Sequence, residues 1–310
     1  MPHSPLDFNV SDLQINEPEI QSIIEDDFIK KNIELSVLRL DQIHPVISGN
    51  KFFKLFYFLQ EAKNSTHKRV ITFGGAYSNH LAATAFACRQ SNLNCIGIVR
   101  GEEPKILSPT LQFCLENGMT LSFLSRGSYK HKTEKLFLHD LIKKHGEHVL
   151  IPEGGYAIKG AKGAGLINRF YNCNDYTHIC LPVGTATTFA GMVNENESQT
   201  EIIGFSVLKN MHDLDKRLKE LKVNTHSKYS FITEYHFGGY AKKTNELTRF
   251  MNDFYYHQSI PLDFVYTGKM MFGIYDLIRK NHFPGGSKLL AIHTGGLQGN
   301  NSLEKGTLIF

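Results

Sequence analysis

The chain has 310 residues, 41% of them hydrophobic, and its 34 basic and 30 acidic residues give a formal charge of +4. This length and apolar content allow one large domain or two medium ones, each with a full core. The small basic excess lacks the clustering that is typical of nucleic-acid-binding proteins, so we expect no nucleic-acid partner.

Targeting and redox features favour a cytoplasmic protein. No window approaches ~18 uninterrupted apolar residues, and the first twenty residues lack a basic stretch followed by an apolar one, so we expect neither a membrane partner nor a secretory signal. The five cysteines are odd in number and have no C-x-x-C spacing, which is typical of reduced, buried thiols. The histidines between residues 131 and 148 lack cysteines or carboxylates at ligand spacing, so we expect no metal.

Short β-rich runs alternate with helical patterns almost throughout the chain, which predicts parallel strands joined by helical crossovers. The expected strands lie at 34–40, 69–75, 94–100, 120–125, 148–155, 178–184, 201–208, 229–235, 262–268 and 289–296. One intervening helix has clear ends, because Ser108 can cap it, Pro109 fits its first position and Gly118 can close it in a left-handed conformation. The apolar spacing within 132–146 predicts a second helix, which would end at Gly146.

The stretch "SGNKFFKL" (48–55) predicts a helix start with a lysine, Lys51, in the first turn. Its neighbours Phe52, Phe53 and Leu55 make the helix apolar nearly all round, so we expect it to be covered on both sides. An amine in this position is desolvated and lies near the positive end of the helix dipole, and both effects lower its pKa and make it nucleophilic. Lysines of this kind form Schiff bases, although a solvated side chain is the ordinary alternative.

Four strand-to-helix junctions pair glycine with hydroxyl or amide side chains, and such loops bind ligands in open α/β sheets. They are "GGAYSNH" (74–80), "PVGTATTFAG" (182–191), "VYTGKMM" (265–271) and "IHTGGLQG" (292–299). In the second junction, "GTATT" exposes backbone N–H groups and hydroxyls at a helix N-terminus, which suits a phosphate; an ordinary capped turn is the alternative. The first junction presents Ser78, Asn79 and His80, or simply a capped helix start, and without G-x-S-x-G it does not favour a serine hydrolase.

A desolvated lysine, a phosphate loop and an asparagine able to bond a phenolic oxygen together describe a pyridoxal phosphate site. Together with "HPVISGNKFFKL", the four junction motifs, the first of them extended to "TFGGAYSNH", give five ordered matches between residues 44 and 299. The chain thereby resembles the pyridoxal-phosphate-dependent family of 1-aminocyclopropane-1-carboxylate (ACC) deaminase and D-cysteine desulfhydrase, which has the tryptophan-synthase-β type fold (PLP fold type II).

The resemblance implies cofactor contacts for the matching residues. Lys51 is similar to the Schiff-base lysine and Lys54 to a phosphate contact. Asn79 matches the residue that bonds the phenolic oxygen, and Thr294 would lie near the pyridine nitrogen. The implied phosphate loop consists of Gly184, Thr185, Ala186, Thr187 and Thr188.

The resemblance also implies catalytic and substrate-binding residues. Ser78 matches a hydroxyl that faces the substrate carboxylate or, in ACC ring opening, attacks the ring or handles a proton. Tyr266 matches a tyrosine close to cofactor and substrate, so Lys51, Ser78 and Tyr266 are the expected catalytic residues. The residues expected to bind substrate are Ser78, Asn79, His80, Tyr266 and Thr267.

Two threonines favour one reaction of the family. ACC deaminases carry glutamate at the place of Thr267 and leucine at the place of Thr294, whereas this chain resembles the desulfhydrases there and at His80. A neutral hydroxyl gives a weaker electron sink, which suffices for expelling a thiolate because the leaving group takes the electrons. We therefore expect D-cysteine desulfhydrase-like β-elimination, giving pyruvate, ammonia and hydrogen sulfide. The alternatives are deamination of ACC to 2-oxobutanoate and ammonia, a related pyridoxal phosphate racemase or dehydratase, and a cofactor-holding protein without activity.

The implied architecture is a two-domain α/β subunit, usually a homodimer, in which each domain is an open, mostly parallel twisted sheet flanked by helices and the cofactor lies between the domains. We expect a smaller domain at 49–157 and a larger cofactor-binding domain formed by 1–48 and 158–310. Relatives commonly carry an arginine where this chain has Phe52 and Phe53, and they lack Tyr156 in the turn at 154–157. These departures leave the substrate open.

Overall fold

The structure is a computed structural model and describes residues 15–310. They divide into two compact units: unit 1 includes Leu55–Gly155, and unit 2 consists of Glu17–Lys54 and Tyr156–Phe310. The domain boundaries expected at 49 and 157 stay a prediction, because compact units of one chain need not fold separately. Residues 1–14 of the expected larger domain, on which most of the secretory-signal argument rests, lie outside the described residues.

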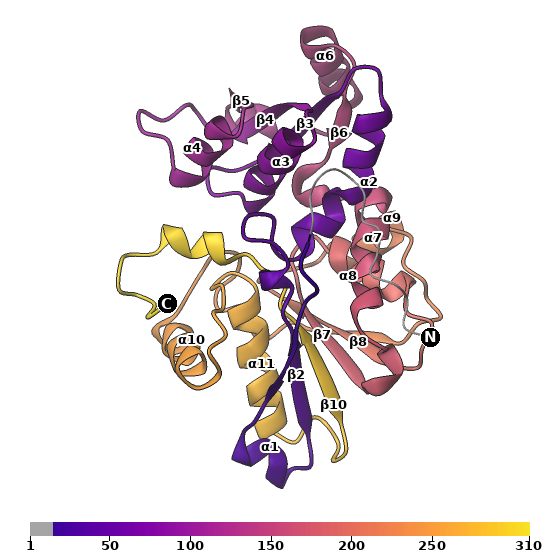
Figure 1. The fold of residues 1–310 in the computed structure, drawn as a ribbon, viewed down its shortest axis with the longest axis vertical. Coiled ribbons are helices and arrows are strands. Elements are labelled where there is room, and N and C mark those ends of the chain that lie inside the picture. Colours follow the sequence, from indigo (N-terminus) through magenta and orange to yellow (C-terminus); the bar gives the residue numbers. More distant parts are fainter. Residues whose placement is uncertain (1–14) are drawn as a thin grey trace. The chain divides into compact units, whose positions relative to one another are not determined.

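Unit 1 is built on a four-stranded parallel sheet with the order β5-β4-β3-β6 (Figure 1). Its strands are β3 (Arg69–Gly74), β4 (Asn94–Arg100), β5 (Met119–Leu124) and β6 (Val149–Ile151), and its helices are α3 (Asn79–Gln90), α4 (Pro109–Glu116), α5 (Arg126–Tyr129) and α6 (Lys135–His145). Buried Ile71, Phe73 and Ile98 from the sheet pack with Tyr129 of α5 and Leu141 of α6. The central strand β3 leads directly into the junction at 74–80.

Unit 2 is built on a six-stranded sheet with the order β1-β2-β10-β7-β8-β9, in which only the β1–β2 pair is antiparallel. Figure 1 labels β2, β10, β7 and β8 of this sheet. Its strands are β1 (Ile20–Ile23), β2 (Glu34–Leu38), β7 (His178–Val183), β8 (Glu201–Ser206), β9 (Tyr229–Ile232) and β10 (Lys288–Ile292). Its helices are α1 (Asp26–Lys30), α7 (Ile158–Gly165), α8 (Thr187–Asn194), α9 (Leu214–Glu220), α10 (Asn245–Gln258) and α11 (Thr267–Arg279).

Helix α2 (Asn50–Asn64) contributes its first turn to unit 2 and the remainder to unit 1. Short 3₁₀ helices complete the chain: η1 (Leu40–Gln42), η2 (Glu153–Gly155), η3 (Leu166–Phe170), η4 (Cys173–Asp175) and η5 (Leu297–Ser302). The α/β class with mostly parallel sheets flanked by helices is confirmed. No helix in the described part of the chain is long and apolar enough to cross a membrane.

The strand expected at 262–268 is wrong. These residues form a turn that leads into α11, and their backbone N–H groups bond to side chains instead of a neighbouring strand. The N–H of Phe264 donates to Asn300, and the following N–H groups donate to Asp263. The apolar residues that resembled a strand are nevertheless buried in the core of unit 2. Burial alone does not distinguish a strand from a capped turn.

Strand β1 was not predicted, since its four residues are too short to show a clear alternation. The helix ends expected near residue 108 are confirmed: Ser108 accepts a hydrogen bond from the N–H of Leu111, Pro109 opens α4, and Gly118 has a φ of 78°. Ser78 likewise caps α3 by accepting from the N–H of Leu81, at 3.3 Å.

Helices α7 and α8 pack at backbone distance, because glycines occupy their contact. A Cβ built on Gly191 of α8 would lie 2.0 Å from the carbonyl oxygen of Ala161 in α7. A Cβ built on Gly163 would lie 2.1 Å from the carbonyl oxygen of Phe53, so α7 also touches the first turns of α2. Real Cβ atoms do not approach oxygen this closely, so both positions require glycine.

Replacing Gly191 by alanine should lower the free energy of unfolding by about 2 kcal/mol, because overpacking outweighs the better helix propensity of alanine. The urea midpoint of the cofactor-free protein measures this. Gly127→Ala is the matched control, since the Cβ at Gly127 meets only the Ser125 hydroxyl at 3.8 Å. A midpoint for Gly191→Ala at or above the wild-type value would contradict the close approach.

Candidate functional site

Three of the predicted motifs meet in unit 2. Strands β7 and β10 are parallel neighbours, so the junctions after them, at 184–188 and 293–296, leave the same edge of the sheet. The start of α2 reaches that edge as well. The N–H of Asn50 donates to the carbonyl oxygen of Thr294 at 3.2 Å, and Gly49, with a φ of 68°, lies directly against the same carbonyl. A Cβ at Gly49 would lie 1.9 Å from that oxygen, so the approach requires glycine.

Lys51 lies in the first turn of α2, as predicted. Its Nζ donates to Oδ1 of Asn50 at 2.7 Å and lies 6.0 Å from the centre of the Tyr266 ring. Burial lowers the pKa of Lys51 to about 8, against an opposing effect from the charge of Asp263. The pKa of Lys54, one turn further along the helix, is lowered well below its usual range by burial and by the charge of Lys51. Two amines of reduced basicity therefore lie together in one helix.

The loop 184–188 ends at the N-terminus of α8. Ala186 takes a left-handed conformation with a φ of 64°, and Thr187 and Thr188 begin the helix with both side chains buried. The hydroxyl of Thr187 lies 2.9 Å from that of Thr185. A Cβ at Gly184 would lie 3.1 Å from the Tyr266 ring, so the loop also borders that ring. Hydroxyls and unpaired N–H groups at a helix start are the donors that bind a phosphate.

Arg217 supports this loop from α9. Its Nη1 donates to the carbonyl oxygen of Gly184 at 3.2 Å, and its guanidinium also pairs with Asp213 at 2.8 Å. The contact fixes the first peptide of the loop from outside. Sequence reasoning missed Arg217, because nothing in the local pattern of α9 indicates which residue faces a loop over thirty positions away.

Asp263 anchors the start of α11. Its Oδ1 accepts from the N–H of Val265 at 2.9 Å and of Tyr266 at 2.8 Å, and its Oδ2 accepts from the N–H and the hydroxyl of Thr267 at 2.9 and 2.7 Å. Asp263 and Thr267 are fully buried. Since the Thr267 hydroxyl also accepts from the N–H of Asp263, it is used on both sides within the cap. Its expected contact with substrate stays a prediction.

A second tyrosine lies beside Tyr266. The rings of Tyr240 and Tyr266 are 6.0 Å apart, and their hydroxyl oxygens are 3.5 Å apart. The loop that carries Tyr240 is held by Lys269 of α11, whose Nζ donates to the carbonyl oxygens of His236 at 2.9 Å and Gly239 at 2.7 Å. Burial lowers the pKa of Lys269 to about 8, again opposed by the charge of Asp263.

Thr294 is 4% exposed at the end of β10, and the residue before it is fixed on two sides. Nε2 of His293 bonds the carbonyl oxygen of Pro261 at 2.7 Å, and Nδ1 lies 3.3 Å from Asp41. Asp41 also takes two hydrogen bonds from Arg39, at 2.9 and 2.8 Å. This buried network sets the direction in which the chain leaves the strand.

Ser78, Asn79 and His80 lie in unit 1, at the start of α3. Nε2 of His80 bonds the Thr72 hydroxyl at 2.9 Å, and that hydroxyl donates in turn to the carbonyl oxygen of Ile151. The hydroxyl has one proton, so Nε2 of His80 must be the donor. His80 is 3% exposed and contacts the core of unit 1. The substrate contacts expected of Ser78, Asn79 and His80 stay predictions.

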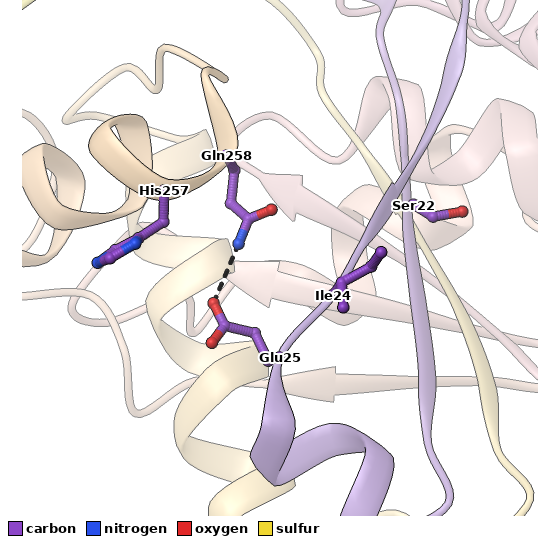
Figure 2. A pocket seen from close by; sticks show the side chains of 5 residues that line it. All are labelled: Ser22, Ile24, Glu25, His257 and Gln258. Carbon is purple, nitrogen blue, oxygen red and sulfur yellow. Dashed lines mark hydrogen bonds between the residues drawn. The ribbon is translucent and has the colours of Figure 1, made fainter.

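Unit 2 also has a surface pocket of about 350 Å³, away from the residues described above. Figure 2 shows the side chains that line it. The pocket is lined by Ser22, Ile24, Glu25, His257 and Gln258. In the sheet register Ile23 pairs with Leu35, near the amino end of β2, whereas the loops described above follow the carboxyl ends of β7 and β10. The pocket is therefore no candidate for the same site. Among the described residues, no group of three or more His, Cys, Asp or Glu could hold a metal.

Residues 28–295 match the sequence family described as "Pyridoxal-phosphate dependent enzyme". The match covers most of the chain, and the protein therefore belongs to this family of enzymes and uses pyridoxal 5'-phosphate. Its fold of two mostly parallel α/β sheets agrees with that membership.

Several proteins named or described as ACC deaminases or their homologues are similar to this chain over most of its length. A Thermotoga maritima protein named "Putative 1-aminocyclopropane-1-carboxylate deaminase" is 30% identical over 289 residues, 87% of this chain and 91% of that protein. A Pyrococcus horikoshii protein of the same name is 29% identical, over 82% of this chain and 81% of its own. A crystal structure described as "the ACC deaminase homologue" has a TM-score of 0.72 and 26% identity, with 92% of this chain and 91% of that chain covered.

The residues gathered in unit 2 fit the cofactor. Lys51 has an amine of lowered pKa, as attachment to an aldehyde requires. The start of α8 offers buried hydroxyls and helix N–H groups to a phosphate. The Lys51 amine and the start of α8 both lie within unit 2.

Removing the Asp263 carboxylate should destabilise unit 2. Asp263→Ala should lower the free energy of unfolding by about 3 kcal/mol, because three N–H groups at the start of α11 lose their acceptor. Asp263→Asn should cost less, since one side-chain oxygen remains. Urea unfolding measures both variants, with Asp253→Ala, an exposed aspartate on α10, as the control. Wild-type midpoints for both Asp263 variants would show that the cap does not hold the helix.

The lowered pKa of Lys51 predicts a pH dependence of stability. Between the folded pKa of about 8 and the ordinary value of 10.5, the unfolded chain keeps a proton that the folded chain has lost, so stability rises with pH across this window and is flat below it. Relative to Lys51→Met, the cofactor-free wild type should gain roughly 3 kcal/mol at most from pH 8 to 10.5.

Urea midpoints at intervals from pH 7 to 10.5 test this dependence. Lys143→Met, at an exposed lysine of α6, should run parallel to the wild type. Parallel curves for Lys51→Met and wild type would mean that folding does not lower the pKa of Lys51.

Proposed function

We propose that this enzyme of the ACC deaminase-like group catalyses β-elimination from a small D-amino acid, with D-cysteine giving pyruvate, ammonia and hydrogen sulfide. The observation that carries the proposal is the neutral, buried hydroxyl of Thr294 at the end of β10. By resemblance to the family, Thr294 would lie near the pyridine nitrogen of the cofactor. A neutral neighbour suits a reaction in which the leaving group takes the electrons.

Bound pyridoxal phosphate supplies the electron sink through which an amino acid loses its α-proton and its β-substituent. Lys51 and Lys54, with the loop Gly184–Thr188, are the proposed residues that hold it. Lys51 Nζ is the proposed atom that takes the α-proton, since a pKa of about 8 leaves part of the amine neutral near neutral pH.

Tyr266 is the second proposed group for proton movement. Its ring borders Gly184, and its backbone is fixed by Asp263. The start of α11 and the loop 184–188 therefore determine where the Tyr266 hydroxyl lies. Asn79 as a contact to the phenolic oxygen and Ser78 as a substrate contact complete the proposal.

Deamination of ACC to 2-oxobutanoate and ammonia is the second candidate, favoured by the names of the relatives. Against it stand Thr267 and Thr294, which differ from the glutamate and leucine of ACC deaminases at the same places. We also propose a homodimer in the cytoplasm, because the family is usually dimeric and all five cysteines are free.

A panel of amino acids separates these functions. With the cofactor-loaded enzyme, D-cysteine and β-chloro-D-alanine should release pyruvate faster than L-cysteine and D-serine do, while ACC should yield little 2-oxobutanoate. Lys51→Ala should lower pyruvate release by at least about 10³-fold, because it removes the proton acceptor and the attachment point. Faster formation of 2-oxobutanoate from ACC would favour ACC deamination. Formation of the opposite enantiomer of the amino acid would favour a racemase. The absence of turnover with every substrate would favour a cofactor-holding protein without activity.

A further inference from the structure

Asn50 lies between the Lys51 amine and the loop 184–188, the two proposed cofactor contacts. Its Oδ1 accepts from Nζ of Lys51 at 2.7 Å, and its Nδ2 donates to the hydroxyl of Thr188 at 2.9 Å. The backbone N–H of Asn50 bonds the carbonyl oxygen of Thr294. Asn50 thus connects three of the motifs in unit 2, which lie near positions 50, 188 and 294 of the sequence.

The surroundings leave the Asn50 carboxamide little freedom. Asn50 is 7% exposed and Thr188 is 4% exposed, so neither polar group can exchange its partner for bulk water at low cost. An amide oxygen accepts and an amide nitrogen donates, so the side chain satisfies both neighbours in only one orientation. Because the Thr188 oxygen accepts from Asn50, the Thr188 hydroxyl can donate its own proton to another acceptor. A bound phosphate needs such hydrogen-bond donors.

We propose that Asn50 is a positioning residue that links the Lys51 amine to the phosphate loop, so that the placement of each depends on the other. The inference rests on the proposed roles of Lys51 and Gly184–Thr188 in holding the cofactor. It assigns a function to a residue that the sequence marks only as the neighbour of a lysine.

The link makes the chemistry of Lys51 depend on Asn50 and Thr188 even without cofactor. An acceptor at 2.7 Å stabilises the protonated amine, so its removal favours the neutral form. Asp263 is the charged group that favours the charged form of Lys51, against the effect of burial. The charge of Lys51 in turn lowers the pKa of Lys54. The Tyr266 ring lies 6.0 Å away. Asp263, Lys54 and Tyr266 remain in every variant below.

The test measures the reactivity of Lys51 in the cofactor-free full chain. Trace acylation with acetic anhydride at a series of pH values, with the Lys51 peptide quantified by mass spectrometry, gives the midpoint of amine titration. Asn50→Leu, of similar shape, should lower this midpoint by about one pH unit. Asn50→Asp should raise it, because it places a carboxylate beside the amine. A general loss of structure would not shift the titration midpoint in opposite directions in the two variants. If one variant does not fold, the shift in the other variant still tests the contact between Asn50 and Lys51.

A double-substitution cycle tests the connection to the loop. Thr188→Val should also lower the midpoint, because Asn50 loses its anchor, but it should add nothing in the Asn50→Leu background. Asn168→Leu is the matched control: the Asn168 amide donates to the carbonyl oxygen of Met192 at the far end of α8, so its removal should leave the midpoint unchanged. Additive effects, or unchanged midpoints in both Asn50 variants, would overturn the proposal.

Borohydride reduction of the protein loaded with pyridoxal phosphate separates this inference from the proposed function. If the label lies on Lys51 and the midpoints do not move, the role of Asn50 is refuted and the cofactor site stands. If the midpoints move as expected and the label lies on another residue, the link exists and the proposed role of Lys51 fails.

Discussion

The candidate site depends on one close approach of two backbones. Gly49 brings the start of α2 against the carbonyl oxygen of Thr294, at a separation that no side chain would permit. This contact allows the next N–H, that of Asn50, to reach the same carbonyl, and it places Lys51 directly after that bond. Any residue larger than glycine would push the helix away from the sheet edge and separate the lysine from the loop at 184–188. The chemistry of the site therefore begins with a steric requirement.

A single buried carboxylate organises the other side of the site. Asp263 holds three successive N–H groups and the Thr267 hydroxyl, and its charge acts on both Lys51 and Lys269. Burial alone would make these amines still less basic. The Asp263 carboxylate therefore fixes the backbone of Tyr266 and limits how far burial lowers the pKa values of Lys51 and Lys269. A buried charge with this many partners is stable because each lone pair is used.

Local signals in the sequence predict much of this arrangement. A lysine between glycine and an apolar helix, a serine before proline at residue 108, and glycine–hydroxyl junctions after apolar strands all have their meaning within a few residues, and the structure has helix starts there. The turn at 262–268 was mistaken for a strand, because its buried apolar residues have no period that distinguishes the two. Asn50 and Arg217 could not be identified, because their partners lie 138 and 33 positions away. Only the folded chain brings such pairs together.

Two lysines of unit 2 share a pKa of about 8, yet they differ in what can reach them. Lys269 is 1% exposed and its amine is occupied by two carbonyl oxygens, whereas Lys51 keeps part of its surface accessible. The similar pKa values leave both amines partly neutral, so surface access is what distinguishes them. Access favours Lys51 as the proposed point of attachment for an aldehyde.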